Sequence, residues 1–348
     1  MANTHAKEVF NAFEATFSDK KEIAETLELG ATFRGKQIFK WIAAGVSSFE
    51  GMTNLSLDLR DSLSKKASVF SSFVSQKLVD PDGTIKLQIT LHDSLCIETV
   101  LLIDSEGRKT ACVSCQAGCA MACAFCQTGK LGFARNLTAG EIVEQFLYLE
   151  KECGKLDNIV FMGMGEPMLN LPEIRKAIAI LAHKDGRNLS TRRITISTSG
   201  VIKGIYDLAD NGPAVRLAVS LTTADQQLRE TLMPIAKSNP LPELSKAIRY
   251  YIEKTGKRCT LEAALLSGIN TTQESANNIK KFVGNLPIHV NVIPWNPVEG
   301  LPYREPDVNE CANFIKLLEQ KKINVTQRTR RGRKIGGACG QLGKTVKI

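Results

Sequence analysis

From residue 109 to residue 328 the sequence alternates short apolar runs with longer amphipathic segments, and this order restricts the fold more than any other feature. Apolar runs of about 4–8 residues are typical of buried strands, and apolar residues spaced three and four apart are typical of helices. The predicted strands are 109–115, 158–163, 192–198, 215–221, 259–265, 288–294 and 323–328. The predicted helices are 139–152, 171–183, 201–210, 225–232, 241–255, 272–283 and 307–320.

This order contains six strand–helix alternations, which predicts a parallel sheet covered by helices. The strands are continuously apolar, as expected where both faces of a sheet are buried. A complete TIM barrel needs eight repeats. We therefore predict an α/β fold built on a partial (β/α)6 barrel, with the active site at the carboxyl ends of its strands.

The regions that flank the barrel differ from it in character. Residues 1–70 show helical spacing of apolar residues at 6–17, 35–43 and 57–67. Residues 72–104 contain three short apolar runs broken by turn residues, which predicts a small antiparallel meander. We therefore divide the chain into an N-terminal helical domain (1–70), a short β-rich extension (71–109), the barrel (110–330) and a C-terminal tail (331–348).

Charge and cysteine content indicate the environment of the protein. The net charge of +9 and the pI near 9.0 suit a polyanionic partner such as RNA, although charge alone identifies none. The chain has ten cysteines and no apolar leader, which indicates a reducing cytoplasm and a metal or redox role. No run approaches the roughly 20 apolar residues that cross a bilayer, so we expect no membrane contact.

Cys119, Cys123 and Cys126 follow the first barrel strand with the spacing C-x3-C-x2-C. Three close thiolates can ligate three irons of a 4Fe–4S cluster, which normally takes four cysteines. One iron is then open to an outside ligand, and S-adenosylmethionine (SAM) binds such an iron through its amino and carboxylate groups. An electron from the cluster can split the sulfonium and release a carbon radical.

Two simpler interpretations of these cysteines are open. A structural zinc site normally shows two ligand pairs, and none of the four histidines is placed to complete one. In the second interpretation, the three cysteines are buried thiols with no ligand role. A disulfide framework is not expected in a chain of this length without a secretion signal.

Polar residues follow the later barrel strands at the edge where the active site is expected. Gly165 and Glu166 lie in the segment MGMGEP, where the glycines allow close backbone approach and the carboxylate could accept from an ammonium group. Ser197 begins STSG, whose hydroxyls could bind a ribose or carboxylate, or cap the next helix. Asn296 lies between two prolines and is either a ribose or adenine contact or a turn residue.

Two further cysteines lie outside the cluster motif. Cys339 is flanked by glycines and follows the basic run 327–334, which suggests an exposed and reactive thiol. The same run could bind phosphates, or be a solvated tail. Cys112 lies seven residues before Cys119, and its spacing alone favours a place in the core.

Taken together, several motifs resemble the RlmN family of RNA adenine-C2 methyltransferases. They are CVSCQAGCAMACAFC, GFARNLTAGEI, NIVFMGMGEPMLNL, RRITISTSG, VIPWNP and GGACGQLG. The resemblance runs from FRGKQIFKWI near the N-terminus to residue 343. It extends to the sister Cfr-type enzymes, which methylate adenine C8, and this alternative is open.

The resemblance implies a mechanism that uses two SAM molecules per turnover. One SAM methylates Cys339, and a second, bound at the cluster, yields a radical that removes a hydrogen from that methyl group. The methylene then adds to an adenine carbon, and Cys112 takes the ring proton and resolves the adduct, leaving a Cys112–Cys339 disulfide. Glu98 matches the acidic residue assigned as a proton acceptor. The implied SAM contacts are Gly165, Glu166, Ser197, Ser220, Leu221, Thr222 and Asn296.

The resemblance also implies partners. They are large-subunit (23S) rRNA, with tRNA as a second candidate, and a reductant such as flavodoxin or ferredoxin; we expect a monomer whose residues 1–70 bind RNA. Two positions depart from the family pattern. Thr222 stands where the family has histidine in SLH, and Cys115 adds a thiol where the family has serine in VSSQ. A non-catalytic RNA-binding protein that holds zinc is the alternative from another functional class.

Overall fold

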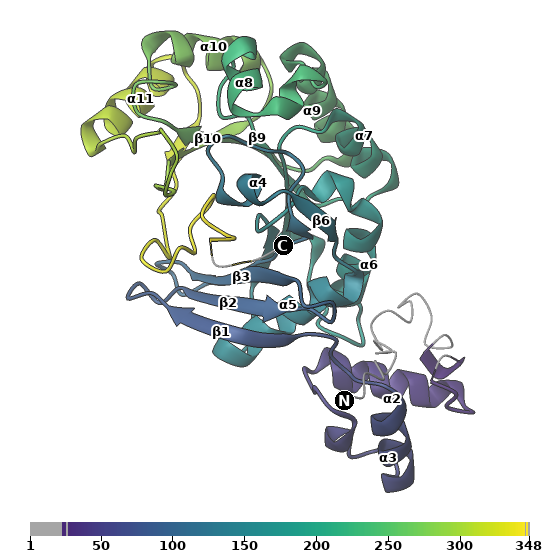
Figure 1. The fold of residues 1–348 in the computed structure, drawn as a ribbon. Helices are drawn as coiled ribbons and strands as arrows, with labels where there is room; N and C mark the ends of the chain where they lie inside the picture. Colours follow the sequence, from purple (N-terminus) through teal and green to yellow (C-terminus); the bar gives the residue numbers. More distant parts are fainter. Residues whose placement is uncertain (1–22, 26, 345, 347–348) are drawn as a thin grey trace.

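The computed structural model describes residues 23–25, 27–344 and 346 (Figure 1). The N-terminal part contains α2 (Thr32–Ala43), the short helix η1 (Phe49–Gly51) and α3 (Leu57–Lys66), and two of the predicted helices are thus confirmed. The helix predicted at 6–17 lies outside the described residues. The N-terminal helices lie beyond the end of α6 in Figure 1, where the Phe39 ring contacts the His183 ring edge-on at 5.0 Å.

A parallel sheet forms the body of the protein, and the predicted partial barrel is confirmed (Figure 1). Within the described residues the parallel strands are, in spatial order, β4 (Lys109–Cys112), β7 (Asn158–Phe161), β8 (Ile194–Thr198), β9 (Arg216–Ser220), β10 (Cys259–Leu265), β11 (His289–Pro294) and β12 (Val325–Gln327). The order follows the chain, as expected for repeated right-handed crossovers through helices.

Helices follow the strands along the outer face of this sheet (Figure 1). They are α5 (Ala139–Cys153), α6 (Leu171–Ala182), α7 (Ile202–Asn211), α8 (Gln226–Leu232), α9 (Leu241–Thr255), α10 (Gln273–Val283) and α11 (Val308–Gln320). The predicted start of α5 is confirmed, because Thr138 and Glu141 form a reciprocal capping box. Residues 192–193, predicted as strand, instead belong to the short helix η3 (Thr191–Arg193).

The predicted meander extends the same sheet. Strands β1 (Phe73–Val79), β2 (Ile85–Thr90) and β3 (Cys96–Ile103) are antiparallel, and β3 pairs with β4 through Val100 and Cys112. The sheet therefore has ten strands and runs from β1 at one edge to β12 at the other. An open edge remains on both sides, so the barrel is incomplete.

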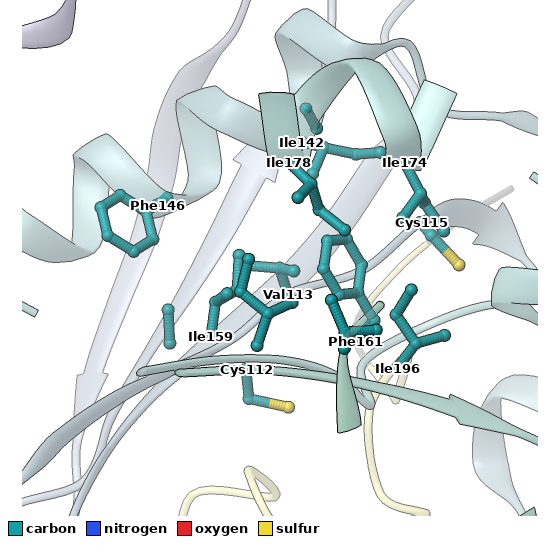
Figure 2. Packing of buried hydrophobic residues seen from close by; sticks show 14 of the residues in the cluster. Cys112, Val113, Cys115, Ile142, Phe146, Ile159, Phe161, Ile174, Ile178 and Ile196 are labelled. Carbon is teal, nitrogen blue, oxygen red and sulfur yellow. The ribbon is translucent and has the colours of Figure 1, made fainter. Parts of the chain in front are cut away.

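The core lies between the parallel strands and the helices (Figure 2). Ile159 and Phe161 of β7 point toward α5 and α6, and both are almost fully buried. Side chains alternate between the two faces of a strand. Cys112 consequently points away from this core, into the interior of the barrel, while the neighbouring Val113 points into the core.

The segment between Cys112 and Thr138 contains elements that the sequence patterns do not predict. Strands β5 (Gln116–Gly118) and β6 (Phe133–Asn136) pair with each other, and α4 (Gln127–Leu131) lies between them. In addition, η2 (Pro167–Leu169) and η4 (Pro234–Lys237) are single turns. Each of these elements is too short to show a period in the sequence. None of the described helices is both long and apolar enough to cross a bilayer.

Candidate active site

A cavity of about 190 Å³ opens at the carboxyl ends of the barrel strands, and we call it the inner cavity. It brings together the three cysteines of the motif and most of the polar residues predicted at the strand ends. Among its lining residues are Cys119, Cys123, Cys126, Gly165, Glu166, Ser197, Ser220, Thr222, Asn296 and Cys339. Among the SAM contacts that the resemblance implies, Leu221 is the exception, because it is fully buried and does not line this cavity.

The three motif thiols are half-buried in the cysteine loop, and backbone N–H groups donate to two of them, Cys119 and Cys126. Burial raises the pKa of Cys119 to about 12, although the backbone N–H groups of Met121 and Gly165 oppose this shift. Burial also raises the pKa values of Cys123 and Cys126. Three adjoining thiols in a low-dielectric site can ionise together only beside a strong positive charge, which cluster irons provide.

The donor set is compatible with a cluster whose irons each take one cysteine thiolate. Within the residues that the structure describes, no three His, Cys, Asp or Glu side chains are close enough together to hold one metal ion. All three motif cysteines line the inner cavity. N–H groups directed at cluster sulfurs are among the features that set cluster properties.

We expect substitution of Cys123 by serine to prevent cluster assembly. The iron content of the anaerobically reconstituted protein should fall from about four per chain to below one, because two ligands cannot hold the cube. Iron and sulfide analysis measures this. Cys153→Ser is the matched control, because Cys153 lies at the end of α5 and lines neither cavity described here. Retention of the full iron content by Cys123→Ser would contradict the ligand assignment.

Glycine is required at position 165 for the close approach of two segments. Gly165 has φ +103°, and a Cβ there would lie 2.6 Å from the Cβ of Gln116. This contact brings the end of β7 against the cysteine loop. Glu166 follows, fully buried, and accepts hydrogen bonds from the backbone N–H and Oγ of Ser199 at 2.7 and 2.6 Å. Burial raises the pKa of Glu166, so a cationic ligand would favour its charged form.

Thr222 occupies a strained position at the end of β9. Its φ is +59°, which is uncommon for a β-branched residue. The conformation is fixed on both sides: its N–H donates to the carbonyl of Glu262 at 3.2 Å, and its own carbonyl accepts from Asn270 Nδ2 at 2.9 Å. The backbone therefore directs Thr222 into the inner cavity despite its departure from the family residue.

Asn296 connects the inner cavity to the C-terminal tail. Its Nδ2 donates to the carbonyl of Cys339 at 3.0 Å. Its Oδ1 is buried without a hydrogen-bond partner. A buried acceptor without a partner is costly, and a ligand hydroxyl or amino group would satisfy it. The turn-residue alternative does not account for this free acceptor.

A second and larger cavity of about 730 Å³ adjoins the first, and we call it the basic cavity. Its wall contains seven arginines and both predicted catalytic cysteines. The arginines are Arg108, Arg192, Arg193, Arg216, Arg328, Arg330 and Arg331. Cys339, Asn296 and Arg328 line both cavities. Such a concentration of guanidinium groups favours a phosphate-bearing ligand.

Cys112 and Cys339 both line the basic cavity. Burial raises the pKa of Cys112 to about 12, Cys339 adds to the shift, and the positive charge of Arg328 opposes it. Cys339 is exposed, as its glycine-rich surroundings predict. All ten cysteines are free, so the disulfide predicted between Cys112 and Cys339 is not formed in this structure.

Glu98 lies apart from both cavities. It is fully buried, accepts from Lys86 Nζ at 2.8 Å, and accepts from the backbone N–H of Gly343 at 2.7 Å through its second oxygen. Neither cavity includes it in its wall. Its position between the sheet and the tail does not favour direct contact with a substrate.

The sequence patterns did not indicate two functional candidates, Arg229 and Arg328. The structure also shows where Cys115, one of the two departures from the family pattern, lies. Arg229 is fully buried, donates to the carbonyl of Ser199 at 2.7 Å, and has its pKa lowered to about 10 by burial. The neighbouring Cys123 thiol opposes this shift, which places the guanidinium beside the cluster loop. Arg328 is one of several basic residues in the run 327–334, and nothing in the sequence distinguishes it from its neighbours. Cys115 is buried near Ile174 on the core side of the loop (Figure 2) and does not line the inner cavity.

The chain is similar to known proteins in both sequence and structure. Residues 113–276 match the radical SAM superfamily, and residues 25–69 match the ribosomal RNA large subunit methyltransferase N-terminal domain. A radical SAM methyltransferase from Sphaerobacter thermophilus has a similar structure, with a TM-score of 0.89 and 38% identity over 93% of this chain and 97% of that one.

Curated relatives are similar over almost their whole length. A probable dual-specificity RNA methyltransferase RlmN from Treponema denticola is 60% identical over 94% of each chain. A protein of the same name from Treponema pallidum is 55% identical over 94% of this chain and 96% of its own. These matches decide against the non-catalytic zinc protein. The chain belongs to the RlmN family of dual-specificity RNA methyltransferases, which are radical SAM enzymes that use a 4Fe–4S cluster and SAM.

Proposed function

We propose that this enzyme methylates C2 of an adenosine in 23S rRNA and in tRNA. The place of Cys339 carries the proposal. Its thiol lies in the wall shared by the two cavities, close enough to Cys112 and to Cys126 to raise both of their pKa values. A methyl carrier needs this position, because it must accept its methyl group on one side and deliver it on the other.

The chemistry of adenine explains why a carrier is needed. C2 lies between two ring nitrogens and is electron-poor, so it cannot attack the methyl group of SAM directly. When bound, the cluster and SAM supply a methyl group for Cys339 and a carbon radical that removes one hydrogen from it. Cys119, Cys123 and Cys126 would hold the cluster, with Glu166 and Asn296 available to SAM.

The two cysteines then divide the remaining work. The sulfur-bound methylene of Cys339 would form a C–C bond to C2. The aromatic ring is restored when the adduct loses the C2 proton and one electron, for which the cluster, oxidised when it generated the radical, would be the acceptor. Cys112 accepts that proton. Cys112 then gives up that proton, and its thiolate attacks the sulfur of Cys339, forming a disulfide as the S–C bond breaks. One proton is returned to the released methylene, which becomes the methyl group. Arg328 favours the thiolate of Cys112, because it opposes the effect of burial on the pKa.

The basic cavity supports a nucleotide in RNA as the substrate. Its seven arginines suit phosphate binding, and its volume of about 730 Å³ is sufficient for a nucleotide. The base must be unstacked to bring C2 to Cys339. The names of the relatives as dual-specificity enzymes favour two RNA substrates. We further propose that residues 1–70 bind RNA and that a flavodoxin or ferredoxin is the reductant. We propose a monomer that acts in the cytoplasm.

Methylation at C8 is the competing function, because it would use the same two cysteines. Nucleoside analysis of RNA incubated with reconstituted enzyme, SAM and a reductant separates the products. We expect 2-methyladenosine. Formation of 8-methyladenosine would assign the Cfr-type activity instead, and absence of any methyladenosine would contradict the proposed reaction.

A further inference from the structure

We propose that the β1–β2 hairpin and the buried Lys86–Glu98 pair form a clamp that positions the tail loop carrying Cys339. Lys86, Glu98, Asp80 and Asp82 are then positioning residues. The functional part of this inference rests on the proposed carrier role of Cys339. The structural part depends only on contacts between the sheet extension and the tail, which lie side by side in Figure 1.

The hairpin turn holds the tail before Cys339. Asp82 Oδ2 accepts from the backbone N–H of Gly332 at 2.9 Å, and Asp80 Oδ2 accepts from the N–H of Lys334 at 2.9 Å. These bonds go to the backbone of the tail, so they fix its path independently of its side chains. A Cβ on Gly332 would lie 2.8 Å from Thr84 Cγ2, so the two segments also pack closely.

Both aspartates are oriented for this contact by the turn itself. Asp80 Oδ1 accepts from the N–H of Asp82 at 3.1 Å, and Asp82 Oδ1 accepts from the N–H of Thr84 at 2.9 Å. Each carboxylate therefore uses one oxygen within the turn and presents the other to the tail. This arrangement pre-organises two acceptors for the N–H groups of Gly332 and Lys334, where the tail enters a turn.

The ion pair holds the tail on both sides of Cys339. Lys86 Nζ donates to the carbonyl of Gly336 at 3.3 Å, and Glu98 Oε2 accepts from the N–H of Gly343 at 2.7 Å. Lys86 and Glu98 are 3% and 0% exposed, and 2.8 Å separates their charged atoms. Removing two charges from water is costly, so such a pair is an inefficient way to stabilise a sheet. Recognition of a backbone loop is a better account of it.

Between these anchors the loop is tied to the cluster region. The carbonyl of Gly340 accepts from the N–H of Gln127 at 2.8 Å, and the carbonyl of Leu342 accepts from Thr128 Oγ1 at 2.7 Å. Cys339 is thus held between the clamp and the loop of the cluster ligands. Loss of the clamp should lower the effective concentration of its thiol at Cys112, with a large effect on rate.

Two variants release the clamp by different routes. Lys86→Met with Glu98→Leu replaces the pair with apolar side chains, a change that is often neutral or stabilising for the fold. Asp82→Ala removes an exposed turn residue and leaves Glu98 intact. Asp93→Ala is the matched control, because Asp93 caps the β2–β3 turn through the N–H of Leu95 and Arg135 but does not touch the tail.

The first measurement is limited trypsin digestion of the full-length reconstituted protein, with cleavage sites identified by mass spectrometry. Cleavage within 330–334 should be at least about fivefold faster in both clamp variants than in Asp93→Ala, because local opening exposes the basic run. Unfolding temperatures should match within a few degrees. Equal cleavage in clamp and control variants would overturn the inference. This arm is independent of the enzymatic activity.

The second measurement separates positioning from proton transfer. With reconstituted enzyme, Asp82→Ala should lower kcat for RNA methylation about tenfold, with KM for RNA little changed. If Glu98 serves only as a proton acceptor, Asp82→Ala keeps full activity, and the functional part of the clamp is rejected. If the wild-type protein makes no methyladenosine, the proposed function fails, and the digestion still decides whether the clamp exists.

Discussion

Replacement of Cys339 by alanine is expected to abolish RNA methylation, by at least about 10³-fold, while the cluster and the fold remain intact. The side chain is exposed and makes no packing contribution that alanine would lose. Without its sulfur there is no atom to carry the methyl group between the two cavities. A direct reaction of adenine C2 with SAM has no accessible path, so covalent catalysis contributes the whole rate.

Three measurements on the same sample test this result. Nucleoside analysis should find no methyladenosine, mass spectrometry should find no S-methylcysteine at position 339, and iron content should equal that of the wild type. Cys96→Ala is the control, because Cys96 is a half-buried thiol of β3 that lines neither cavity. Methylated RNA from Cys339→Ala at more than a trace level would refute the carrier role.

The barrel was predictable because its elements are long and their patterns are strong. Strands such as 259–265 and helices such as α5 carry enough apolar residues in register to show their period, and the capping box fixed the start of α5. The short elements of the cysteine loop were not predictable. In α4, Gly129 approaches the backbone of Cys123 so closely that a Cβ would lie 2.9 Å from its nitrogen. Tertiary contacts of this kind, rather than propensity, shape that loop.

The residues of the candidate site also fall into two groups, those that the sequence predicts and those that it does not. The cluster cysteines and the strand-end residues follow local motifs, and the fold brings them to one cavity because parallel strands end at the same edge. Glu98 and Arg229 depend on partners far away in the sequence. Glu98 meets Gly343, and Arg229 meets Ser199, and no local pattern reports either contact. Burial of a charged residue is decided by the whole fold, so the sequence patterns predict neither of these contacts.

Cys112 shows the limit of spacing as an argument. Its position in an apolar strand favours the core, and the residue is only 7% exposed. However, the alternation of side chains along β4 directs Cys112 into the barrel and Val113 into the core (Figure 2). Both residues are buried and apolar in character. Only the face of the strand distinguishes a packing thiol from one that lines the basic cavity.

Replacement of Cys112 by alanine is therefore expected to stall the reaction after the C–C bond forms. Cys339 should still be methylated, because its path to the inner cavity is unchanged. The adduct should form and then persist, since no thiolate is present to attack the sulfur of Cys339. We expect a protein–RNA cross-link that survives denaturation, and less than about 1% of the wild-type yield of free methyladenosine.

Denaturing gels with labelled RNA measure the cross-link, and mass spectrometry of nuclease-treated peptides should locate it at Cys339. Cys112→Ala combined with Cys339→Ala is the informative control: it should form no cross-link, because the attachment atom is missing. The change at Cys112 should leave the fold intact, since its side chain points into a cavity and leaves no void in the core. Release of free methylated RNA by Cys112→Ala at the wild-type rate would show that another group resolves the adduct. Cys115 is not a candidate for that role, because its thiol is buried on the core side of the cysteine loop.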